Sequence, residues 1–253
     1  MRNVILHYHI FKNAGTSIET ALSRSFGSAW RSYDKDPLWA NVTASDFLEI
    51  LEAEPELKAI SSHQGRWPVP SADGLRIFPL LLLRHPIDRV GSMYSYNRRI
   101  GEPDAMARTL SEYVDWLLGD CGSMVVRSFQ TLFLSDDDAL TDFPGGPVSE
   151  VTADHLSSAL NRLNGLEVFG LVERFEESIA IFRQWLEPTF PELKLTVFRE
   201  NASTDRHSSL KERLHKIANQ LGRRRMRRLK RVNEADLELW SSATEQFERR
   251  WGR

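Results

Sequence analysis

The sequence predicts an α/β fold in which a central parallel β-sheet is flanked by helices. Segments rich in β-branched and aromatic residues alternate with segments of helical periodicity, which is the pattern of a parallel sheet with helical crossovers. Residues 76–83 are almost all apolar, as expected for a strand that helices cover on both faces. Neither an internal repeat nor a change of composition divides the 253 residues, so we predict a single domain over residues 1–253.

Helices and strands are placed by their periodicity and by the residues that begin and end them. We predict strands at residues 4–10, 57–62, 76–83, 168–172 and 195–198. We predict helices at residues 17–26, 45–54, 87–99, 110–118, 125–133, 152–163, 175–186 and 208–251. Ser45 or Asp46 is expected to cap the second helix, Pro86 suits the first turn of the third, and the last helix is expected to break near Asn233.

The composition argues against several classes of protein. Lys and Arg total 33 and Asp and Glu total 35, so no excess of positive charge points to nucleic acid as a partner. The one cysteine, Cys121, cannot form an intramolecular disulfide, which favours a reducing compartment. No apolar stretch reaches the ~20 residues that a membrane span needs, and the first apolar stretch is too short for a signal peptide. We therefore expect a cytoplasmic protein with no membrane partner.

A loop of small residues between the first strand and the first helix is a candidate anion site. A lysine opens it, a glycine and an alanine let the backbone approach a ligand, and two hydroxyls follow where helical N–H groups favour negative charge. The residues are Lys12, Asn13, Ala14, Gly15, Thr16 and Ser17. The alternative is an ordinary strand–helix turn in which Ser or Thr caps the helix. The Walker pattern of nucleotide hydrolases is absent, because the lysine precedes the glycine.

A second candidate anion site follows the apolar strand. Arg84 comes at the strand end, where its guanidinium can bind a phosphate through two N–H groups, and Ser92 comes about two helical turns later. The alternative pairs Arg84 with the helix carboxylate of Asp88. Ligands of open parallel sheets bind beyond the carboxyl ends of the strands, so we expect Lys12, Arg84 and His63 to lie at one edge of the sheet.

These two segments together resemble the sulfotransferase superfamily. In that family a lysine followed by Gly-Thr-Ser binds the 5′-phosphosulfate of 3′-phosphoadenosine-5′-phosphosulfate (PAPS), and Arg-x-Pro with a later serine binds the 3′-phosphate. The resemblance assigns donor binding to Lys12, Asn13, Ala14, Gly15, Thr16, Ser17, Arg84 and Ser92, and to Asn201 within a similar segment at 198–203. It implies a P-loop-NTPase-like sheet, a PAPS donor that leaves as 3′,5′-ADP (PAP), and no requirement for a metal.

Within this superfamily, the chain is most similar to the branch of the heparan sulfate 2-O-sulfotransferases and related Golgi carbohydrate sulfotransferases, with their soluble bacterial relatives. Residues 169–175 and 236–240 also resemble segments of that branch. Unlike the Golgi enzymes, this sequence shows neither a membrane span nor the cysteines for a disulfide. The resemblance implies transfer of a sulfuryl group to a hydroxyl of a carbohydrate or of another small molecule.

Two residues are candidates for the catalytic roles. Lys12 is placed to stabilise the charge that develops on the bridging oxygen of the leaving group. His63 ends the second strand, and the matching segment of the carbohydrate branch also carries a histidine, so we predict that His63 is the general base. The alternative is a packed or capping histidine. His7 and His9 lie inside the first strand and are expected to be structural, although one of them could line the site.

The sequence leaves two other functions open. A P-loop kinase or NTPase shares the fold, but it needs a Mg²⁺-binding acid and a Walker lysine that we cannot place. The second open function is that of a nucleotide-binding protein that catalyses no reaction. The basic run at 222–231 either binds an anion or belongs to a helix whose Leu221, Met226, Leu229 and Val232 pack on the core. The aspartates at 136–138 have no His or Cys nearby and do not predict a metal site.

Overall fold

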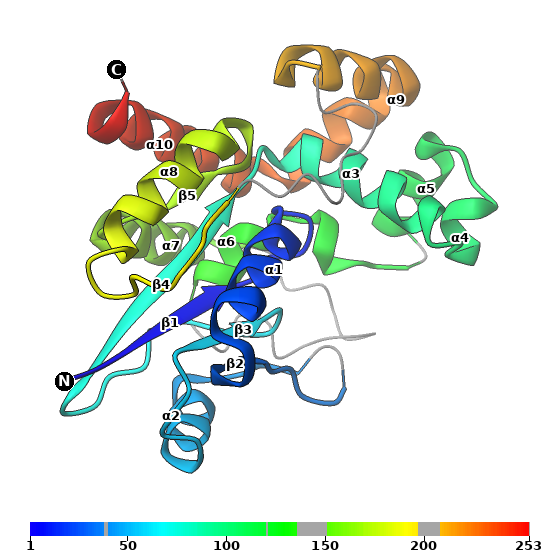
Figure 1. Cartoon of the computed structure of the whole chain (residues 1–253). Helices are drawn as coiled ribbons and strands as arrows, with labels where there is room; N and C mark the ends of the chain where they lie inside the picture. The colour runs from blue at the N-terminus through cyan, green and yellow to red at the C-terminus, as the bar shows by residue number, and fades with distance from the viewer. Residues whose placement is uncertain (38–39, 120, 136–150, 197–207, 253) are drawn as a thin grey trace.

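Figure 1 shows the computed structural model of the chain, which describes residues 1–37, 40–119, 121–135, 151–196 and 208–252. A five-stranded sheet forms the centre, in the order β2-β3-β1-β4-β5, and all of its neighbouring strands are parallel. The strands are β1 (Arg2–Tyr8), β2 (Trp30–Ser32), β3 (Ala59–Ser62), β4 (Leu75–Leu83) and β5 (Gly170–Leu171). The parallel sheet with its flanking helices confirms the predicted fold class.

The two central strands bring the candidate anion sites to one edge of the sheet. β1 and β4 pair in parallel from Arg2 opposite Leu75 to Tyr8 opposite Leu81. Both strands therefore end at the same edge, where β1 leads into the loop that contains Lys12 and β4 leads into Arg84 (Figure 1).

Helices surround the sheet and form most of the rest of the chain. They are α1 (Gly15–Phe26), α2 (Ala44–Ala53), α3 (Pro86–Arg99), α4 (Pro103–Met106), α5 (Leu110–Leu118), α6 (Phe129–Leu134), α7 (Ala153–Gly165), α8 (Phe175–Leu186), α9 (Leu210–Val232) and α10 (Glu234–Trp251). The predicted bounds of α5 and α8 are confirmed, and the predicted break at Asn233 separates α9 from α10.

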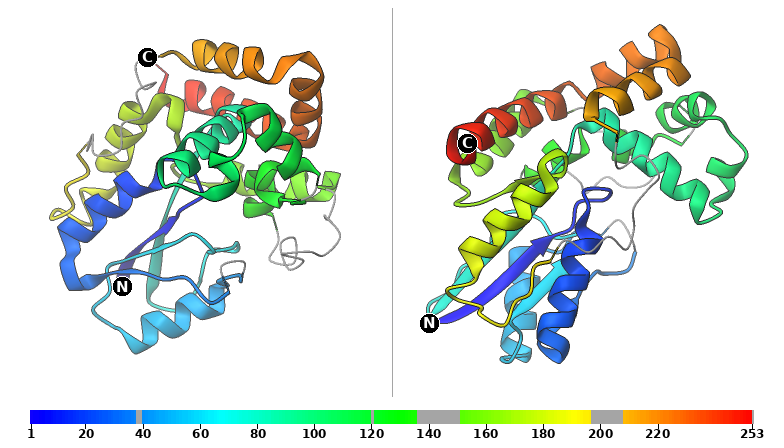
Figure 2. Two further views of the ribbon diagram at one scale, coloured as in Figure 1. Left: turned by 90° about the vertical axis from the view of Figure 1, so that its right-hand side faces the viewer. Right: turned by 45° about the horizontal axis from the view of Figure 1, so that its top comes forward.

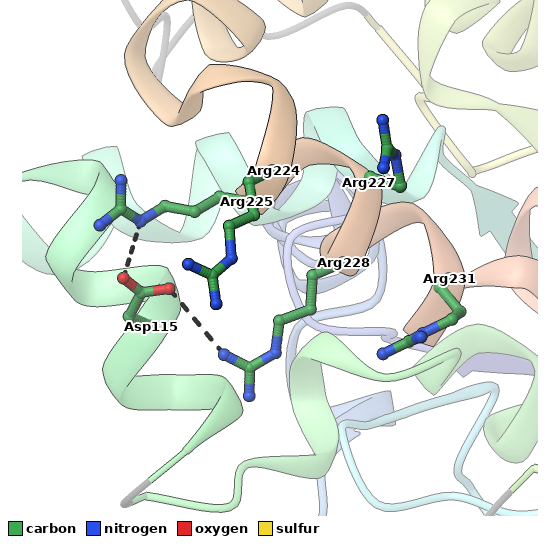
Figure 3. A pocket seen from close by; sticks show the side chains of 6 residues that line it. All are labelled: Asp115, Arg224, Arg225, Arg227, Arg228 and Arg231. Atoms are coloured by element: carbon green, nitrogen blue, oxygen red, sulfur yellow. Dashed lines mark hydrogen bonds and ion pairs between the residues drawn. The ribbon is translucent and has the colours of Figure 1, made fainter.

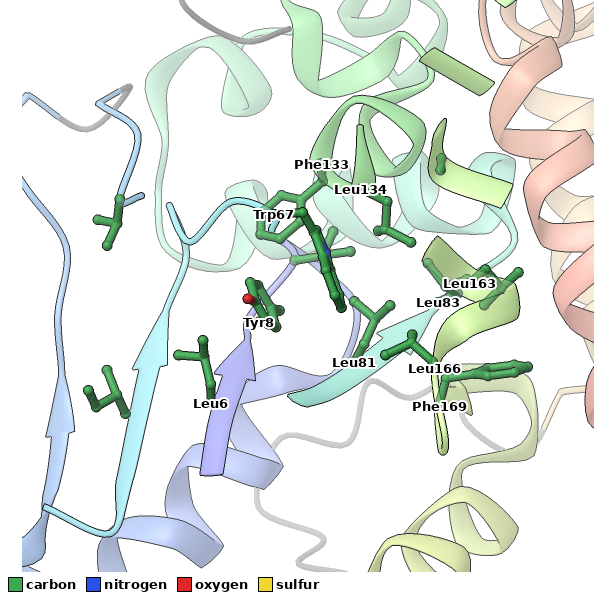
Figure 4. Packing of buried hydrophobic residues seen from close by; sticks show 14 of the residues in the cluster. Leu6, Tyr8, Trp67, Leu81, Leu83, Phe133, Leu134, Leu163, Leu166 and Phe169 are labelled. Atoms are coloured by element: carbon green, nitrogen blue, oxygen red, sulfur yellow. The ribbon is translucent and has the colours of Figure 1, made fainter. Parts of the chain in front are cut away.

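Side chains alternate along β1 between two cores, one on each face of the sheet. Leu6 and Tyr8 belong to a core that α2, α6, α7 and α10 close, and Figure 4 shows both packed near Trp67 and Phe133. Ile5 faces the opposite core, which α1 and α8 close. Because His7 and His9 share their face with Ile5, they point toward the α1 side of the sheet.

A third apolar cluster lies away from the sheet, beneath α9. Val90 on α3, Val114 on α5 and Leu221 and Leu229 on α9 are buried together, so α9 packs across α3 and α5 (Figure 2). α9 is interrupted at Gly222. The φ of this residue, 70°, lies in the left-handed region, which glycine adopts without strain. This packing holds the C-terminal helices against α3, the helix that follows Arg84.

Several sequence-based boundaries were wrong. Thr43 caps α2 with a capping box, in place of Ser45 or Asp46. The helix predicted at 125–133 begins only at Phe129, after a short 3₁₀ turn at Met124–Val126. β2 was not among the predicted strands. Leu195 has no regular structure, and the end of the strand predicted at 195–198 falls outside the described residues.

Among the described residues, no helix has both the length and the apolar character that are needed to cross a membrane.

Candidate active site

The loop between β1 and α1 adopts a conformation suited to an anion. Lys12 and Ala14 both have positive φ, 66° and 61°, which turns the backbone sharply before the helix. Ala14 is the N-cap residue of α1 and has no side chain that can accept a hydrogen bond. The expected alternative, a Ser or Thr cap, is therefore not present. Within the described residues no side chain caps the first turn of α1. The N–H of Ser17 donates to the carbonyl oxygen of Ala14 over 3.3 Å, and the N–H groups before it are left for another acceptor.

Gly15 is required at its position by the close approach of His9. A Cβ atom at Gly15 would lie 2.0 Å from Cδ2 and 2.3 Å from Nε2 of His9, well inside van der Waals contact. The His9 ring thus packs directly beneath the first residue of α1. Any larger residue at position 15 has to displace either that ring or the loop.

Asn13 anchors the loop to the neighbouring strand. Its side-chain amide donates to the carbonyl oxygen of Leu82 over 2.7 Å and to Oε1 of Gln130 over 2.8 Å. The residue is 2% exposed, so its side chain is turned into the protein. We predicted that Asn13 binds the donor, and its place in the structure is that of a residue that holds the loop in shape.

Lys12 projects from the loop and lies over an aromatic ring of α3. Its Nζ lies 3.9 Å from the centre of the Tyr96 ring, a cation–π contact. Burial, together with the positive charges of Arg84 and Arg99, lowers the pKa of Lys12 to about 8. A lysine crowded by two other cations gains from an anionic ligand that neutralises them. Thr16 and Ser17 stand next to it, in the first turn of α1, exposed and half-buried.

Arg84 joins the two candidate anion sites directly. Its Nη1 donates to the carbonyl oxygen of Lys12 over 2.9 Å. Its Nε donates to Oδ2 of Asp88, also over 2.9 Å. Asp88 forms a second ion pair with Arg213 of α9. The pairing with Asp88 that we gave as the alternative is therefore present, together with the contact to the loop. Ser92 lies half-buried on α3, further from the strand end.

Gln130 of α6 forms hydrogen bonds to both candidate anion sites, and we did not identify it from the sequence. Its Oε1 accepts from the side chain of Asn13 and, over 2.9 Å, from the backbone N–H of Arg84. Its Nε2 donates to the carbonyl oxygen of Arg84 over 2.8 Å. Asp236 of α10 is fully buried and in turn accepts from the backbone N–H groups of Gln130 and Thr131. One side chain from α6 thus sets the relative position of the loop and the strand end.

His63 forms a hydrogen-bonded pair with Asp34, a residue that the sequence analysis did not select. Its Nδ1 lies 2.9 Å from Oδ2 of Asp34, and Oδ1 of the same carboxylate accepts from the His63 backbone N–H and from Ser62 Oγ. Burial alone would lower the pKa of His63, but the hydrogen bond and charge of Asp34 outweigh it and raise the pKa above its usual value of 6.5. The side chain is 42% exposed, so it can reach a ligand.

The three histidines expected near the first strands lie next to one another. The rings of His9 and His63 are 4.0 Å apart between centres, and those of His7 and His9 are 5.2 Å apart. Burial lowers the pKa of both His7 and His9, and neighbouring histidines lower it further. Because His9 also contacts Gly15, the ring stack connects His63 to the base of the loop. The geometry therefore places His63 beside the Lys12 loop.

Two residues that follow strand ends, Trp67 after β3 and His85 after β4, lie outside this group. Trp67 is 6% exposed and stacks on Tyr8 at 4.9 Å, so it covers the core and is not open to a sugar. His85 packs against Trp240 at 4.7 Å, and burial lowers its pKa to about 4, consistent with a packing role. Asn201, which we predicted to contact the donor, falls outside the described residues.

The basic run forms part of α9, where it lines a pocket against α5. Figure 3 shows Arg225 and Arg228 reaching Asp115 of α5, and Nε of Arg225 lies 2.7 Å from Oδ2 of Asp115. The arginines that line this pocket are Arg224, Arg225, Arg227, Arg228 and Arg231. Leu221 and Leu229 are buried, while Met226 and Val232 pack against the same cluster, which confirms the expected packing of this helix on the core.

Comparison with known proteins agrees with this geometry. A model of the sulfotransferase family matches residues 1–241. An uncharacterized protein of Archaeoglobus fulgidus is 30% identical over 258 residues, which cover 97% of this chain and 98% of that protein. A match of the family model over nearly the whole chain includes both segments that carry the candidate site. The chain therefore belongs to the sulfotransferase family, whose members transfer sulfuryl groups.

Proposed function

We propose that this protein transfers a sulfuryl group from PAPS to a hydroxyl of a carbohydrate or of another small molecule. The observation that carries the proposal is the contact between Arg84 Nη1 and the carbonyl oxygen of Lys12, over 2.9 Å. It means that two cationic groups, from segments far apart in the sequence, face one place at the edge of the sheet. A donor with separate anionic groups at its 5′ and 3′ positions suits such a pair.

The fit of this donor rests on the charge and donor groups of the site. The N-terminus of α1 has no side-chain cap, and Lys12 stands beside it with a depressed pKa, so the 5′-phosphosulfate is assigned to Lys12, Asn13, Ala14, Gly15, Thr16 and Ser17. The 3′-phosphate is assigned to Arg84 and Ser92. Asn201 is proposed to complete this side of the site. In this proposal Asn13 contributes indirectly, because its side chain holds the loop in shape.

The reaction needs a positive charge near the leaving group and a base near the acceptor. PAPS supplies the sulfuryl group, and its departing phosphate gains negative charge as the bond between sulfur and the bridging oxygen breaks. Lys12 and the N–H groups of α1 are aligned before reaction to stabilise that charge. His63 accepts the proton of the acceptor hydroxyl at its free nitrogen, while Asp34 fixes the ring through Nδ1. The acceptor oxygen forms the new bond to sulfur, and PAP leaves.

Titration calorimetry on the full chain tests the choice of donor. We expect 3′,5′-ADP to bind in the absence of Mg²⁺, and Arg84→Ala to weaken that binding strongly. Mg²⁺-dependent binding of ATP, with no binding of 3′,5′-ADP, would identify a kinase or NTPase instead. Arg183→Ala, at an exposed position in the last turn of α8, serves as the matched loss of one guanidinium.

Mass spectrometry identifies the acceptor and separates an enzyme from a binding protein. The chain is incubated with isotopically labelled PAPS and panels of carbohydrates, alcohols and phenols, and each product is recognised by the added mass of one sulfuryl group. We expect sulfation within the carbohydrate panel, and its loss in His63→Ala. Tight binding of 3′,5′-ADP with no sulfated product in any panel would support a nucleotide-binding protein without catalysis.

A further inference from the structure

Three potential metal ligands converge beneath the loop that contains Lys12, in a place that the proposed reaction does not use. His7 lies on β1, His9 directly follows this strand with its ring stacked on that of His7, and Glu19 lies on α1. Their ligand atoms all lie within 4.8 Å of one another. We propose that His7, His9 and Glu19 bind a divalent transition-metal ion of the zinc class.

The strongest support is a buried ion pair whose two atoms are not aligned for a hydrogen bond. His9 is 6% exposed, and its Nδ1 lies 3.0 Å from Oε1 of Glu19. Neither atom has a hydrogen bond of adequate geometry within the described residues. Buried polar atoms are almost always hydrogen-bonded, so an ion pair that lacks this alignment indicates a place for a ligand between its two atoms. A cation that accepts a lone pair from each atom would satisfy both.

The donor set and spacing suit zinc. Two imidazoles and one carboxylate form a common zinc site with three protein ligands, which leaves one position for water. Ligand atoms at 2.0–2.1 Å from a tetrahedral zinc ion are ~3.3 Å from one another. The 3.0 Å separation between His9 and Glu19 is close to that value, and the 4.8 Å limit for the set leaves a small side-chain adjustment on binding.

The surroundings of His7 match those of a metal-bound histidine. Such histidines usually hold their second ring nitrogen in a hydrogen bond that fixes the ring. Nδ1 of His7 lies 3.2 Å from Ser61 Oγ, and the same oxygen accepts from Trp30 Nε1 over 3.1 Å. His7 is 1% exposed, so its ring is held in one orientation by β3 and β2. Ser61→Ala is then expected to weaken the metal by ~10-fold to 100-fold while all three ligands remain.

The position of this site gives the ion a role in the shape of the loop. His9 directly follows β1, and Glu19 lies one turn into α1, so an ion held by both fastens the end of β1 to α1. A bound cation is often the largest local charge in a protein. With one carboxylate among its ligands, a divalent ion leaves net positive charge directly beneath the loop. The inference does not depend on the donor or on the reaction proposed above.

Metal analysis of the purified full chain tests the proposal. The protein is prepared without chelator, its affinity tag is removed, and it is equilibrated with zinc and desalted. We expect stoichiometric zinc in the natural chain and in His215→Ala, which removes an exposed imidazole from α9. We expect loss of zinc in His9→Ala and in Glu19→Gln, the second of which keeps the size of the side chain. Replacement of zinc by cobalt adds a visible spectrum typical of four-coordinate geometry.

Melting temperatures of the chelator-treated proteins show whether each variant is folded. The natural chain is expected to melt at a higher temperature with zinc than without, and Glu19→Gln to show no such difference. Absence of zinc from the folded natural chain would overturn the proposal, and so would equal zinc in Glu19→Gln. Because these measurements use no donor or acceptor, a failed sulfation assay leaves them interpretable.

Discussion

Arg84 Nη1 donates to the carbonyl oxygen of Lys12 over 2.9 Å, across 72 positions of the sequence. The side chain that follows β4 therefore stabilises the left-handed backbone of the residue that follows β1. The two candidate anion sites form one unit, and a change at either position is expected to alter the other. The contact between Arg84 and Lys12, and the side chains that hold it in place, determine the expected effects of substitutions in this site.

Lys12→Ala is expected to reduce the turnover number by about 100-fold to 1,000-fold, the range for loss of one group that stabilises charge in the transition state. Binding of 3′,5′-ADP should weaken far less, because Arg84 and the N-terminus of α1 remain. Steady-state kinetics and calorimetry measure the two effects separately. Lys194→Ala, an exposed lysine outside the site, is the control. Near-normal turnover in Lys12→Ala would remove this residue from the mechanism.

The pH profile of kcat/KM is expected to be bell-shaped. His63 acts as a base only when neutral, and its pKa lies above 6.5, so activity should rise with pH through that raised value. Lys12 acts only when protonated, and its pKa is about 8, so activity should fall as pH passes that value. The profile of kcat should extend to higher pH, because bound phosphate raises the pKa of Lys12. A profile with neither an acidic nor a basic limb would contradict both assignments.

Asp34→Asn is expected to move the acidic limb of that profile to lower pH. The carboxylate of Asp34 raises the pKa of His63, so its removal lets burial lower that pKa and leaves the base neutral over a wider range. The same change loosens the ring, which should lower the maximum rate. Asp104→Asn, whose carboxylate pairs with Arg108, should leave the limb where it is. An unmoved limb in Asp34→Asn would indicate that another group is the base.

Gln130→Ala is expected to destabilise the protein by ~1–3 kcal/mol, because it leaves the Asn13 amide and the backbone groups of Arg84 without their buried partner. Binding of 3′,5′-ADP should also weaken, since the loop and the strand end lose their common support. Urea unfolding and calorimetry check the two effects. Gln220→Ala, exposed on α9, is the matched control. Unchanged stability would mean that this bridge is not formed.

Gly15→Ala is expected to destabilise the protein by ~1–3 kcal/mol, because the added Cβ would meet His9 at 2.0 Å and force the ring aside. Gly165→Ala provides the contrast, since a Cβ there meets no atom within 4 Å. Thermal unfolding of the two variants measures the difference. Equal melting temperatures would show that the loop yields without strain.

The sequence was sufficient for β1, β3, β4, β5 and most helices, because strand ends and apolar runs carry strong local signals. It also placed the segments that contain Lys12 and Arg84 at the same edge of the sheet. Thr43 was overlooked because capping depends on where the chain turns, and two other polar residues nearby offered equivalent signals. β2 is only three residues long and is held mainly by pairing with β3, so its own sequence carries little information.

The supporting residues could not be found in the same way. Gln130 and Asp34 act through partners that the sheet brings close, at separations that no local pattern encodes. His7 and His9 were visible as a pair spaced by two on a strand, but Glu19 becomes their neighbour only once α1 packs on the sheet. Long-range pairing of this kind follows from tertiary structure and not from composition.

The buried carboxylate of Asp236 has a consequence for protein synthesis. It holds the start of α6, and Gln130 of that helix positions both Asn13 and Arg84. A growing polypeptide emerges from the ribosome with its N-terminus first, so the loop is made long before the residue that ultimately secures it. The newly translated chain thus acquires a finished ligand-binding surface only when its last helix has left the exit tunnel.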